Sequence, residues 1–253
     1  MKRTIVITGA SSGIGAAIAR RLGRDGNQLA LAARRAEPLQ AVAAECGPGA
    51  LAVVTDVTRR EDVERLRDEA MRAFGAVDVW INNAGRGITR SVLDLTDADL
   101  DEMMAVNVKS ALYGMQTIVP HFIERGRGHL INISSFLGRV PVAAHRSAYN
   151  AAKAALNALT ANLRADVAAK GIDVSLVMPG LVATEFARNA IGTPSATPPQ
   201  WTPGAAMTPQ TAEEVAEAVV ELIAHPRAEV YTNPASAEMA RKYFEELSAS
   251  PSS

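Results

Sequence analysis

TIVITGASSGIG, at residues 4–15, joins a short β-branched run to a turn that contains three glycines. Residues 4–8 predict a buried strand, and Ile18, Ala19 and Leu22 then recur at helical spacing. Strand, glycine turn and helix in this order are the parts of a dinucleotide site, because glycines let the backbone approach a pyrophosphate and the helix N-terminus offers it free N–H groups. The glycine spacing is Gly-x-x-x-Gly-x-Gly and not Gly-x-Gly-x-x-Gly, so a purely structural turn is the alternative interpretation.

The alternation of strand and helix continues along the chain. Apolar runs predict six further strands, at residues 28–33, 51–55, 77–81, 128–134, 172–178 and 229–231. Helix starts are predicted at Thr58, Thr96 and Thr211, the first of them as a capping box with Glu61. This order predicts an α/β fold, a single-domain Rossmann-like doubly wound parallel sheet of about seven strands with helices on both faces.

Composition narrows the class of protein. The 253 residues have an even composition without a linker, which favours one domain over residues 1–253. A net charge of -1 without blocks of like charge argues against nucleic acid as a partner. The single Cys46 excludes an internal disulfide and, with four histidines, leaves no metal cluster. No apolar run is long enough for a signal peptide or a membrane span, so we expect a cytoplasmic protein.

Two arginines follow the second predicted strand. In a dinucleotide-binding fold this strand end faces the adenosine ribose, where a carboxylate would accept a hydrogen bond from the 2′-hydroxyl. Arg34 and Arg35 stand there instead, and guanidinium groups bind phosphate. The sequence therefore favours NADP(H) over NAD(H), with a solvated arginine pair as the alternative interpretation. Asp56, after the third strand, is either an acceptor for the adenine amino group or a turn residue.

The fourth predicted strand is followed by Asn82-Asn83-Ala84-Gly85. Side-chain amides can tie neighbouring strands together, and Ala and Gly leave room for a flat cofactor, but asparagines at a strand end are also ordinary turn formers. The next predicted helix runs from residue 97 to about 122 and contains Asn107, a mediocre helix former. Taken alone, Asn107 is interpreted as exposed; the alternative is that it distorts the helix and holds a water.

Tyr149 and Lys153 lie four residues apart in Ala-rich sequence, so they share one face of a predicted helix. A neighbouring ammonium lowers the pKa of a phenol, ordinarily near ~10, by favouring the phenolate. Tyr149 can then exchange a proton with a carbonyl or alcohol oxygen. Ser135, after the fifth predicted strand, is placed to hydrogen-bond the same oxygen. An exposed pair without chemical meaning is the alternative interpretation.

The last part of the chain contains a loop and a tail. Residues 185–210 lack periodicity and carry five prolines, which predicts a substrate-binding loop or lid. The tail, residues 232–253, carries an amphipathic helical stripe that predicts packing on the core or on a partner subunit. A membrane-surface role is the alternative interpretation, which the lack of a strongly basic polar face disfavours. Residues 248–253 are predicted to be disordered. A mainly apolar substrate pocket is predicted from Phe136, Leu137, Leu181, Phe186 and Trp201.

These motifs together resemble the classical short-chain dehydrogenases/reductases over residues 3–231. They occur in the order of that family, although each is weak or moderate alone. The matching residues are Thr8 to Gly15, Asp56-Val57, Asn82 to Gly85, Asn107, Ser135 with Gly138, Tyr149 with Lys153, and Pro179-Gly180 with Thr184.

The resemblance implies a role for each matching residue. Tyr149 is the general acid/base, Lys153 lowers its pKa and holds the nicotinamide ribose, and Ser135 orients the substrate oxygen. Asn107 anchors a water that relays protons to Lys153, which replaces the exposed interpretation, and Thr184 binds the nicotinamide carboxamide. The implied cofactor-binding residues are Gly9, Ser11, Ser12, Gly13, Ile14, Gly15, Arg34, Arg35, Asp56, Val57, Asn83, Ala84, Gly85, Tyr149, Lys153, Pro179, Gly180, Val182 and Thr184.

Two departures from the family pattern concern the site. NADP-preferring members often have a second basic residue inside the glycine turn, where this chain has Ser12. Ser135 and Tyr149 are separated by one residue more than in many members, so we expect the loop around Val142 and His145 to shape the pocket differently. His145 is either a substrate contact or an exposed loop residue.

The resemblance implies a short-chain oxidoreductase, active as a homodimer or homotetramer. It would transfer a hydride between NADP(H), or NAD(H), and a carbonyl or secondary alcohol of a mainly apolar small molecule. Two alternatives are a non-catalytic NADP(H)-binding regulator on the same fold and a lyase or epimerase that uses the same site.

Overall fold

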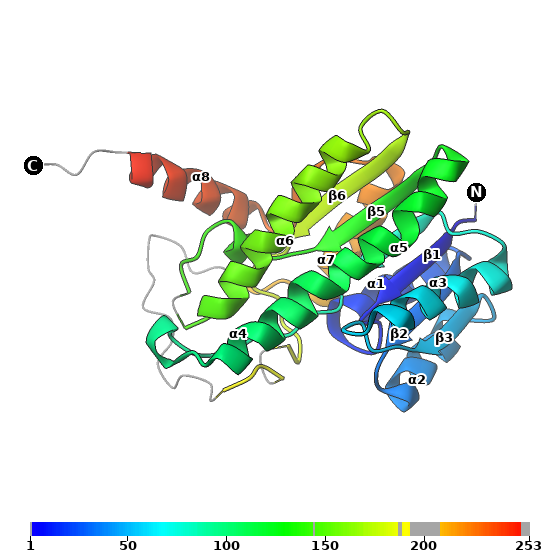
Figure 1. Ribbon diagram of the computed structural model, residues 1–253, viewed down its shortest axis with the longest axis horizontal. Coiled ribbons are helices and arrows are strands. Elements are labelled where there is room, and N and C mark those ends of the chain that lie inside the picture. Colours follow the sequence, from blue (N-terminus) through cyan, green and yellow to red (C-terminus); the bar gives the residue numbers. More distant parts are fainter. Residues whose placement is uncertain (1, 144, 187–188, 193–207, 249–253) are drawn as a thin grey trace, which may run out of the picture.

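The computed structural model describes residues 2–143, 145–186, 189–192 and 208–248. Within these residues the strands form one sheet of seven parallel strands in the order β3-β2-β1-β4-β5-β6-β7 (Figure 1). The strands are β1 Thr4–Thr8, β2 Gln28–Ala33, β3 Ala50–Val54, β4 Val79–Asn82, β5 Gly128–Ile133, β6 Ile172–Met178 and β7 Glu229–Tyr231. The predicted doubly wound α/β sheet is confirmed, and its strand boundaries agree with the sequence within two residues.

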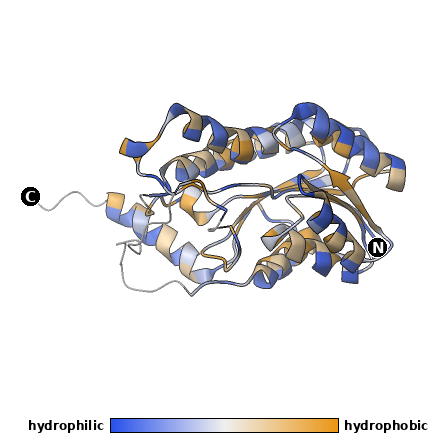
Figure 2. Ribbon diagram, turned by 90° about the horizontal axis from the view of Figure 1, so that it is seen from below, coloured by the Kyte–Doolittle hydropathy of each residue, from blue (hydrophilic) through white to orange (hydrophobic). Residues whose placement is uncertain are grey.

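Helices cover both faces of this sheet (Figure 2). Helices α1, α2 and α7 pack on one face, and α3, α5 and α6 pack on the other. The helices are α1 Gly13–Arg24, α2 Ala36–Cys46, α3 Arg60–Phe74, α4 Asp97–Met104, α5 Ser110–Arg125, α6 Ser147–Asp166, α7 Ala212–Ala224 and α8 Pro234–Ser248.

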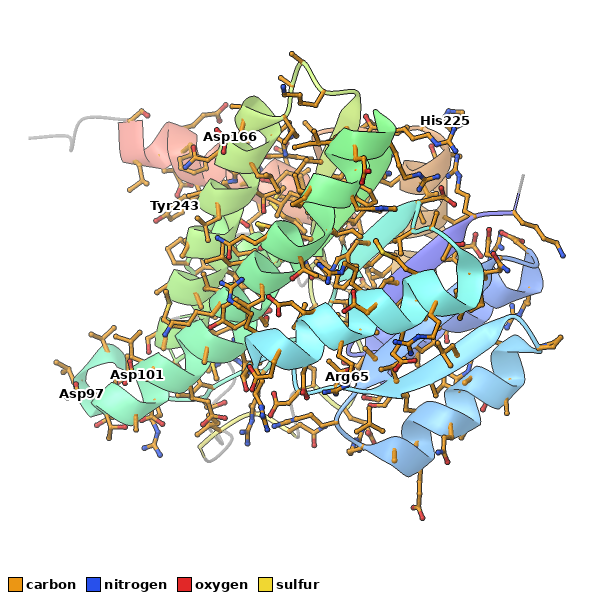
Figure 3. The ribbon with its side chains drawn as sticks, turned by 45° about the vertical axis from the view of Figure 1, so that its right-hand side comes forward. Arg65, Asp97, Asp101, Asp166, His225 and Tyr243 are labelled. Atoms are coloured by element: carbon orange, nitrogen blue, oxygen red, sulfur yellow. The ribbon has the colours of Figure 1, made fainter. Side chains whose placement is uncertain are left out.

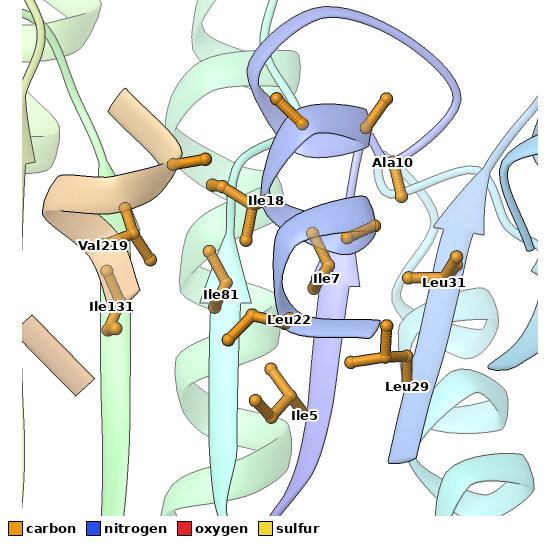
Figure 4. Close-up of a cluster of buried hydrophobic side chains, with 14 of the residues drawn as sticks. Ile5, Ile7, Ala10, Ile18, Leu22, Leu29, Leu31, Ile81, Ile131 and Val219 are labelled. Carbon is orange, nitrogen blue, oxygen red and sulfur yellow. The ribbon is translucent and has the colours of Figure 1, made fainter. Parts of the chain in front are cut away.

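The central strand β1 is buried on both faces. Ile5 and Ile7 lie in the apolar cluster that also contains Ile18 of α1 and Val219 of α7 (Figure 4). Val6, between them, belongs to the cluster on the opposite face. Successive side chains of a strand point to opposite faces of the sheet. A strand covered by helices on both faces therefore has a nearly continuous run of apolar residues in its sequence. This burial is why the first strand could be predicted from sequence.

The direction of winding changes at β1. From this strand the chain proceeds outward through β2 to β3, and then returns to form β4 on the other side of β1. In open α/β sheets, ligands bind in the crevice outside the carboxyl ends of the strands at such a switch point. The glycine turn after Thr8 and the residues after Asn82 lie at this position.

The helix predicted over residues 97–122 is helical throughout, but it is not one uninterrupted α-helix. Helix α4 ends at Met104, a π-helical turn follows at Ala105–Lys109, and α5 begins at Ser110. Asn107 lies in the π-helical turn and is buried, so its exposed interpretation is wrong and the alternative of a distorted helix agrees with the structure. A π-helical turn inserts extra backbone into a helix, and such turns are frequent at functional sites.

The three predicted helix starts have different outcomes. The helix starts at Thr96 and Thr211 are confirmed, and the structure shows that both threonines form capping boxes, with Asp99 and Glu214 respectively. The capping box at Thr58 is wrong, because α3 begins at Arg60 after an N-cap residue that makes no side-chain cap. The Thr58 hydroxyl donates instead to the carboxylate of Asp56 at 2.7 Å.

The predicted tail helix corresponds to α8. Its Met239 and Tyr243 pack against a small cluster that contains Phe136, whereas Phe244 and Leu247 are exposed. Figure 3 shows Tyr243 among the other side chains of the molecule. Packing of this stripe on the core is therefore confirmed for its first half. Residues 193–207, which include Trp201, and residues 249–253 lie outside the described residues, so the predictions made for them stay predictions.

Candidate active site

A cavity of about 970 Å³ lies at the carboxyl ends of the strands. It extends from the glycine turn after β1 to the start of α6. The predicted site residues that line it are Gly9, Ser11, Ser12, Gly13, Ile14, Arg34, Arg35, Asp56, Val57, Asn83, Ala84, Gly85, Ser135, Tyr149, Lys153, Pro179, Gly180, Val182 and Thr184. Gly15 and Asn107 do not line the cavity and act from behind it.

The glycine turn packs directly on the backbone that follows β4. Gly9 has a φ of +68°, and a Cβ added there would lie 2.8 Å from the Cα of Ala84. A Cβ on Gly15 would collide with the carbonyl oxygen of Gly9. Ser12, the N-cap of α1, makes no side-chain cap, which leaves the N-terminal N–H groups of this helix for a ligand. The turn thus forms a cradle that fits a dinucleotide phosphate.

The asparagines after β4 tie neighbouring strands together, as one interpretation of the sequence predicted. Asn82 Nδ2 donates to Asn132 Oδ1 of β5 at 2.9 Å, and Asn83 Nδ2 donates to the carbonyl of Thr8 in β1 at 2.9 Å. These bonds cross the sheet at the carboxyl ends of three adjacent strands. They hold the base of the cavity in one arrangement.

The part of the cavity beside the carboxyl ends of β2 and β3 is lined by Arg34, Arg35 and Asp56. Both arginines are exposed, and Arg35 Nη2 lies 3.3 Å from the hydroxyl of Ser12. Asp56 is a turn residue, since its carboxylate accepts from the backbone N–H of Thr58 at 3.0 Å and from the Thr58 hydroxyl. Because Asp56 also lines the cavity, the turn role and a contact with a ligand are compatible.

Ser135, Tyr149 and Lys153 come together in one part of the cavity. Each is less than 8% exposed, and the hydroxyls of Ser135 and Tyr149 are hydrogen-bonded. Lys153 Nζ donates to the carbonyl oxygen of Ile133 at 3.0 Å and lies 5.7 Å from the centre of the Tyr149 ring. Gly138 lets the turn after Ser135 pack closely on helix α6, because a Cβ at Gly138 would lie 2.7 Å from the backbone of Lys153.

The pKa of Tyr149 differs from the sequence prediction. Burial raises the pKa of Tyr149 to about 12, and the hydrogen bond with Ser135 and the charge of Arg146 lower it by less. Burial also lowers the pKa of Lys153 to about 8. The predicted lowering of the phenol pKa is therefore not seen, because desolvation of the phenol outweighs the effects of Ser135 and Arg146.

Asn107 supports the site from the π-helical turn. Its Nδ2 donates to the carbonyl of Arg86 at 2.9 Å, and its Oδ1 accepts from the N–H of Arg86 at 3.2 Å. A Cβ on Gly85 would lie 2.9 Å from Asn107 Oδ1 and 3.6 Å from Lys153 Nζ. Asn107 therefore fixes the loop that separates it from Lys153. Its predicted water relay stays a prediction.

Sequence reasoning missed Arg146, and it placed Phe186 at the pocket without its contact with Tyr149. Phe186 packs edge-to-face on Tyr149 with ring centres 5.6 Å apart, and Arg146 lines the cavity beside it. Arg146 precedes Tyr149 by three residues, and that helical spacing is the signal that would have found it. His145 also lines the cavity and is half-buried, so it is not the exposed residue of the alternative interpretation.

Neither a membrane span nor a metal cluster is found in the part of the chain that the structure describes. Each helix there is too short or too polar to cross a bilayer. Histidine, cysteine and acidic side chains in the described ranges do not gather in groups of three that could hold a metal ion.

A doubly wound parallel sheet with a glycine cradle at its switch point defines a dinucleotide-binding fold. The sequence model of the short chain dehydrogenase family matches residues 3–193. The chain therefore belongs to the short-chain dehydrogenase/reductase family. An oxidoreductase of Staphylococcus aureus (strain MW2) is 40% identical over 180 residues, which cover 71% of this chain and 78% of that protein.

Solved structures of the same family agree. A short chain dehydrogenase/reductase from Burkholderia phymatum in complex with NAD aligns with a TM-score of 0.87 and 28% identity, over 100% of this chain and 97% of that chain. A short chain dehydrogenase from Burkholderia cenocepacia in complex with NADP aligns with a TM-score of 0.79 and 28% identity, over 99% and 98% of the two chains. The neighbours thus bind either nicotinamide dinucleotide.

Proposed function

We propose that this protein transfers a hydride between NADP(H) and a carbonyl or secondary alcohol of a mainly apolar small molecule. The observation that carries the proposal is the burial of Ser135, Tyr149 and Lys153 together in a cavity that continues to the glycine cradle. The walls near this group include Phe136, Leu137 and Phe186, which suit an apolar substrate.

Each residue has a proposed part in the reaction. A bound nicotinamide would supply the hydride in reduction or accept it in oxidation. In reduction, Tyr149 donates its hydroxyl proton to the substrate oxygen, and the Ser135 hydroxyl hydrogen-bonds that oxygen. Lys153, near the phenol, helps to return a proton to Tyr149, with Asn107 holding a water that completes the relay. Oxidation reverses these proton transfers.

The proposed preference for NADP(H) rests on charge at the adenosine end. Arg34 and Arg35 line the cavity directly after β2, and no carboxylate stands at that strand end. A guanidinium binds a 2′-phosphate, whereas a carboxylate would repel it. Thr184 and Asp56 border the cavity as proposed contacts of the carboxamide and the adenine.

We also propose that the chain acts in the cytoplasm as a homodimer or homotetramer. The half-buried free Cys46 suits a reducing compartment. Exposed Phe244 and Leu247 on α8 and the small side chains of α6 support association. Light scattering on the purified protein would give the number of subunits.

The test follows NADPH and NADH oxidation by absorbance across aldehydes, ketones, diketones and 3-oxoacyl thioesters. We expect turnover with NADPH on at least one class, and loss of at least about 1,000-fold in kcat for Tyr149→Phe with NADPH still bound, since the general acid is removed. Retained turnover in Tyr149→Phe would refute the role of the phenol. Tight NADPH binding without turnover anywhere would favour a regulatory protein.

A further inference from the structure

Arg146 occupies the substrate end of the cavity. It is the N-cap residue of α6, but its side chain makes no cap to the helix. The side chain is half-buried and lines the cavity. Residues three apart at a helix start share a face, so Arg146 and Tyr149 border the same space.

Gly87 lets Arg146 and Phe186 approach each other. A Cβ added to Gly87 would lie 2.9 Å from Nη1 of Arg146 and 2.9 Å from Cε1 of Phe186. The ring of Phe186 in turn packs edge-to-face on Tyr149. A guanidinium, an aromatic ring and the phenol therefore surround one position next to the reacting oxygen.

The Arg146 guanidinium has no carboxylate within 4.0 Å among the residues that the structure describes. Its side-chain hydrogen bond runs from Nη1 to the carbonyl of Ile88 at 3.4 Å, near the long end of the accepted range. Arg86, which also lines the cavity, pairs with Glu102. A partly desolvated cation without a counter-charge is unfavourable, and burial lowers the pKa of Arg146 accordingly.

The phosphates of a dinucleotide do not account for this cation. The glycine cradle follows β1, and Arg34 and Arg35 follow β2, whereas Arg146 begins the helix that follows β5. These elements lie on opposite sides of the switch point. An anion opposite Arg146 must therefore belong to the substrate, which is the ligand that binds this site besides the dinucleotide.

We propose that Arg146 binds a carboxylate of the substrate, carried close to the reacting carbonyl. The inference rests on the proposed function and names its substrate class, which is an oxo acid, or the corresponding hydroxy acid, with an apolar chain. A planar guanidinium matches a carboxylate in geometry as well as charge. Phe186, Leu181 and Met239 line the same cavity and leave apolar surface for the chain.

The test compares two probes that differ only in charge. Hexanoate and hexanamide are titrated calorimetrically into the full chain, with and without NADPH. We expect hexanoate to bind at least about tenfold more tightly than hexanamide, and Arg146→Met to remove that preference, because a charge-assisted hydrogen bond contributes on this scale. Arg127→Met is the matched control, since Arg127 is exposed and does not line the cavity. It should keep the preference within about twofold.

A second variant keeps the inference testable if Arg146→Met does not fold. Gly87→Ala keeps every charge but places a methyl group against the guanidinium and Phe186, so it should also reduce the hexanoate preference. Thermal unfolding midpoints show whether each variant is folded. Equal binding of the two probes to the unsubstituted chain, or an unchanged preference in both variants, would overturn the inference.

Turnover separates this inference from the proposed function. The rate of NADPH oxidation is measured with 3-oxohexanoate and with its methyl ester. Turnover of the ester at equal or higher kcat/KM would overturn the carboxylate preference while supporting the dehydrogenase. A hexanoate preference that depends on Arg146 without turnover of either compound would support the anion site and count against the proposed reaction.

Discussion

Burial acts in opposite directions on the two ionisable side chains of the site. It raises the pKa of Tyr149 to about 12 and lowers that of Lys153 to about 8, because in both cases the neutral form is favoured. A protonated phenol at neutral pH suits the donation of a proton in carbonyl reduction. An amine with a pKa near neutrality can both give and receive a proton, which suits a relay to Tyr149.

Arg34 is the residue at which cofactor preference can be tested. We expect Arg34→Ala to raise the KM for NADPH about tenfold and to change the KM for NADH less than about threefold, because the lost charge-assisted bond concerns the 2′-phosphate alone. The measurement is steady-state kinetics with both cofactors on one substrate. Arg24→Ala, at an exposed position at the end of α1, is the control. Equal effects on NADPH and NADH would contradict the proposed role.

At the scale of elements, the sequence predicted the strands and helices that depend on a local pattern of residues. Strands β2 and β6 are rich in apolar residues, and their predicted bounds match the structure. A helix distorted at Asn107 was one of two interpretations, and local pattern could not choose it, because Asn107 bonds to the backbone of Arg86, 21 residues away. The capping box at Thr58 failed because Asp56 competes for the same hydroxyl.

Strand β5 carries a buried histidine that couples stability to pH. His129 Nε2 lies 2.8 Å from the Ser175 hydroxyl of β6, and burial, with a smaller effect of Arg3, lowers its pKa from 6.5 to about 4. The unfolded chain therefore binds more protons between these values, so the free energy of unfolding falls as pH falls through this window. From pH 7 to pH 5 we expect a loss of about 2 kcal/mol from this residue.

Urea unfolding at the two pH values tests the coupling. His129→Gln should remove about 2 kcal/mol of the difference in unfolding free energy between pH 7 and pH 5, whatever its effect at either pH alone. His225→Gln, at the exposed end of α7, should leave the difference in place (Figure 3). An identical pH dependence in His129→Gln and the unsubstituted chain would refute the assignment.

At the scale of the whole molecule, the site is assembled from parts that are distant in sequence. The motifs at strand ends, from Gly9 to Thr184, could be placed because parallel strands bring their carboxyl ends to one edge. The approach of Phe186 to Tyr149 and of Met239 to the cavity depends on how the loop after β6 and the C-terminal helix fold back. No local pattern encodes those contacts, so they became visible only in the structure.

Helix α8 therefore forms part of the cavity wall. Met239 lines the cavity, and Ala240 packs with Phe136 and Val140 beside Ser135. We expect Met239→Ala to lower kcat/KM for an apolar substrate about tenfold, since about three carbon-sized groups of apolar contact are lost. NADPH affinity should change less than about twofold, because the glycine cradle is at the other end of the cavity.

Phe244→Ala provides the matched comparison for this prediction. Phe244 lies on the same helix, but its side chain is exposed and does not line the cavity. Both variants lose a large apolar side chain, so an effect of α8 on stability or association alone would appear in both. Loss of kcat/KM in Met239→Ala only, with unchanged NADPH affinity in calorimetry, would show that the C-terminal helix shapes the substrate end of the site. Equal losses in the two variants would place its effect in association instead.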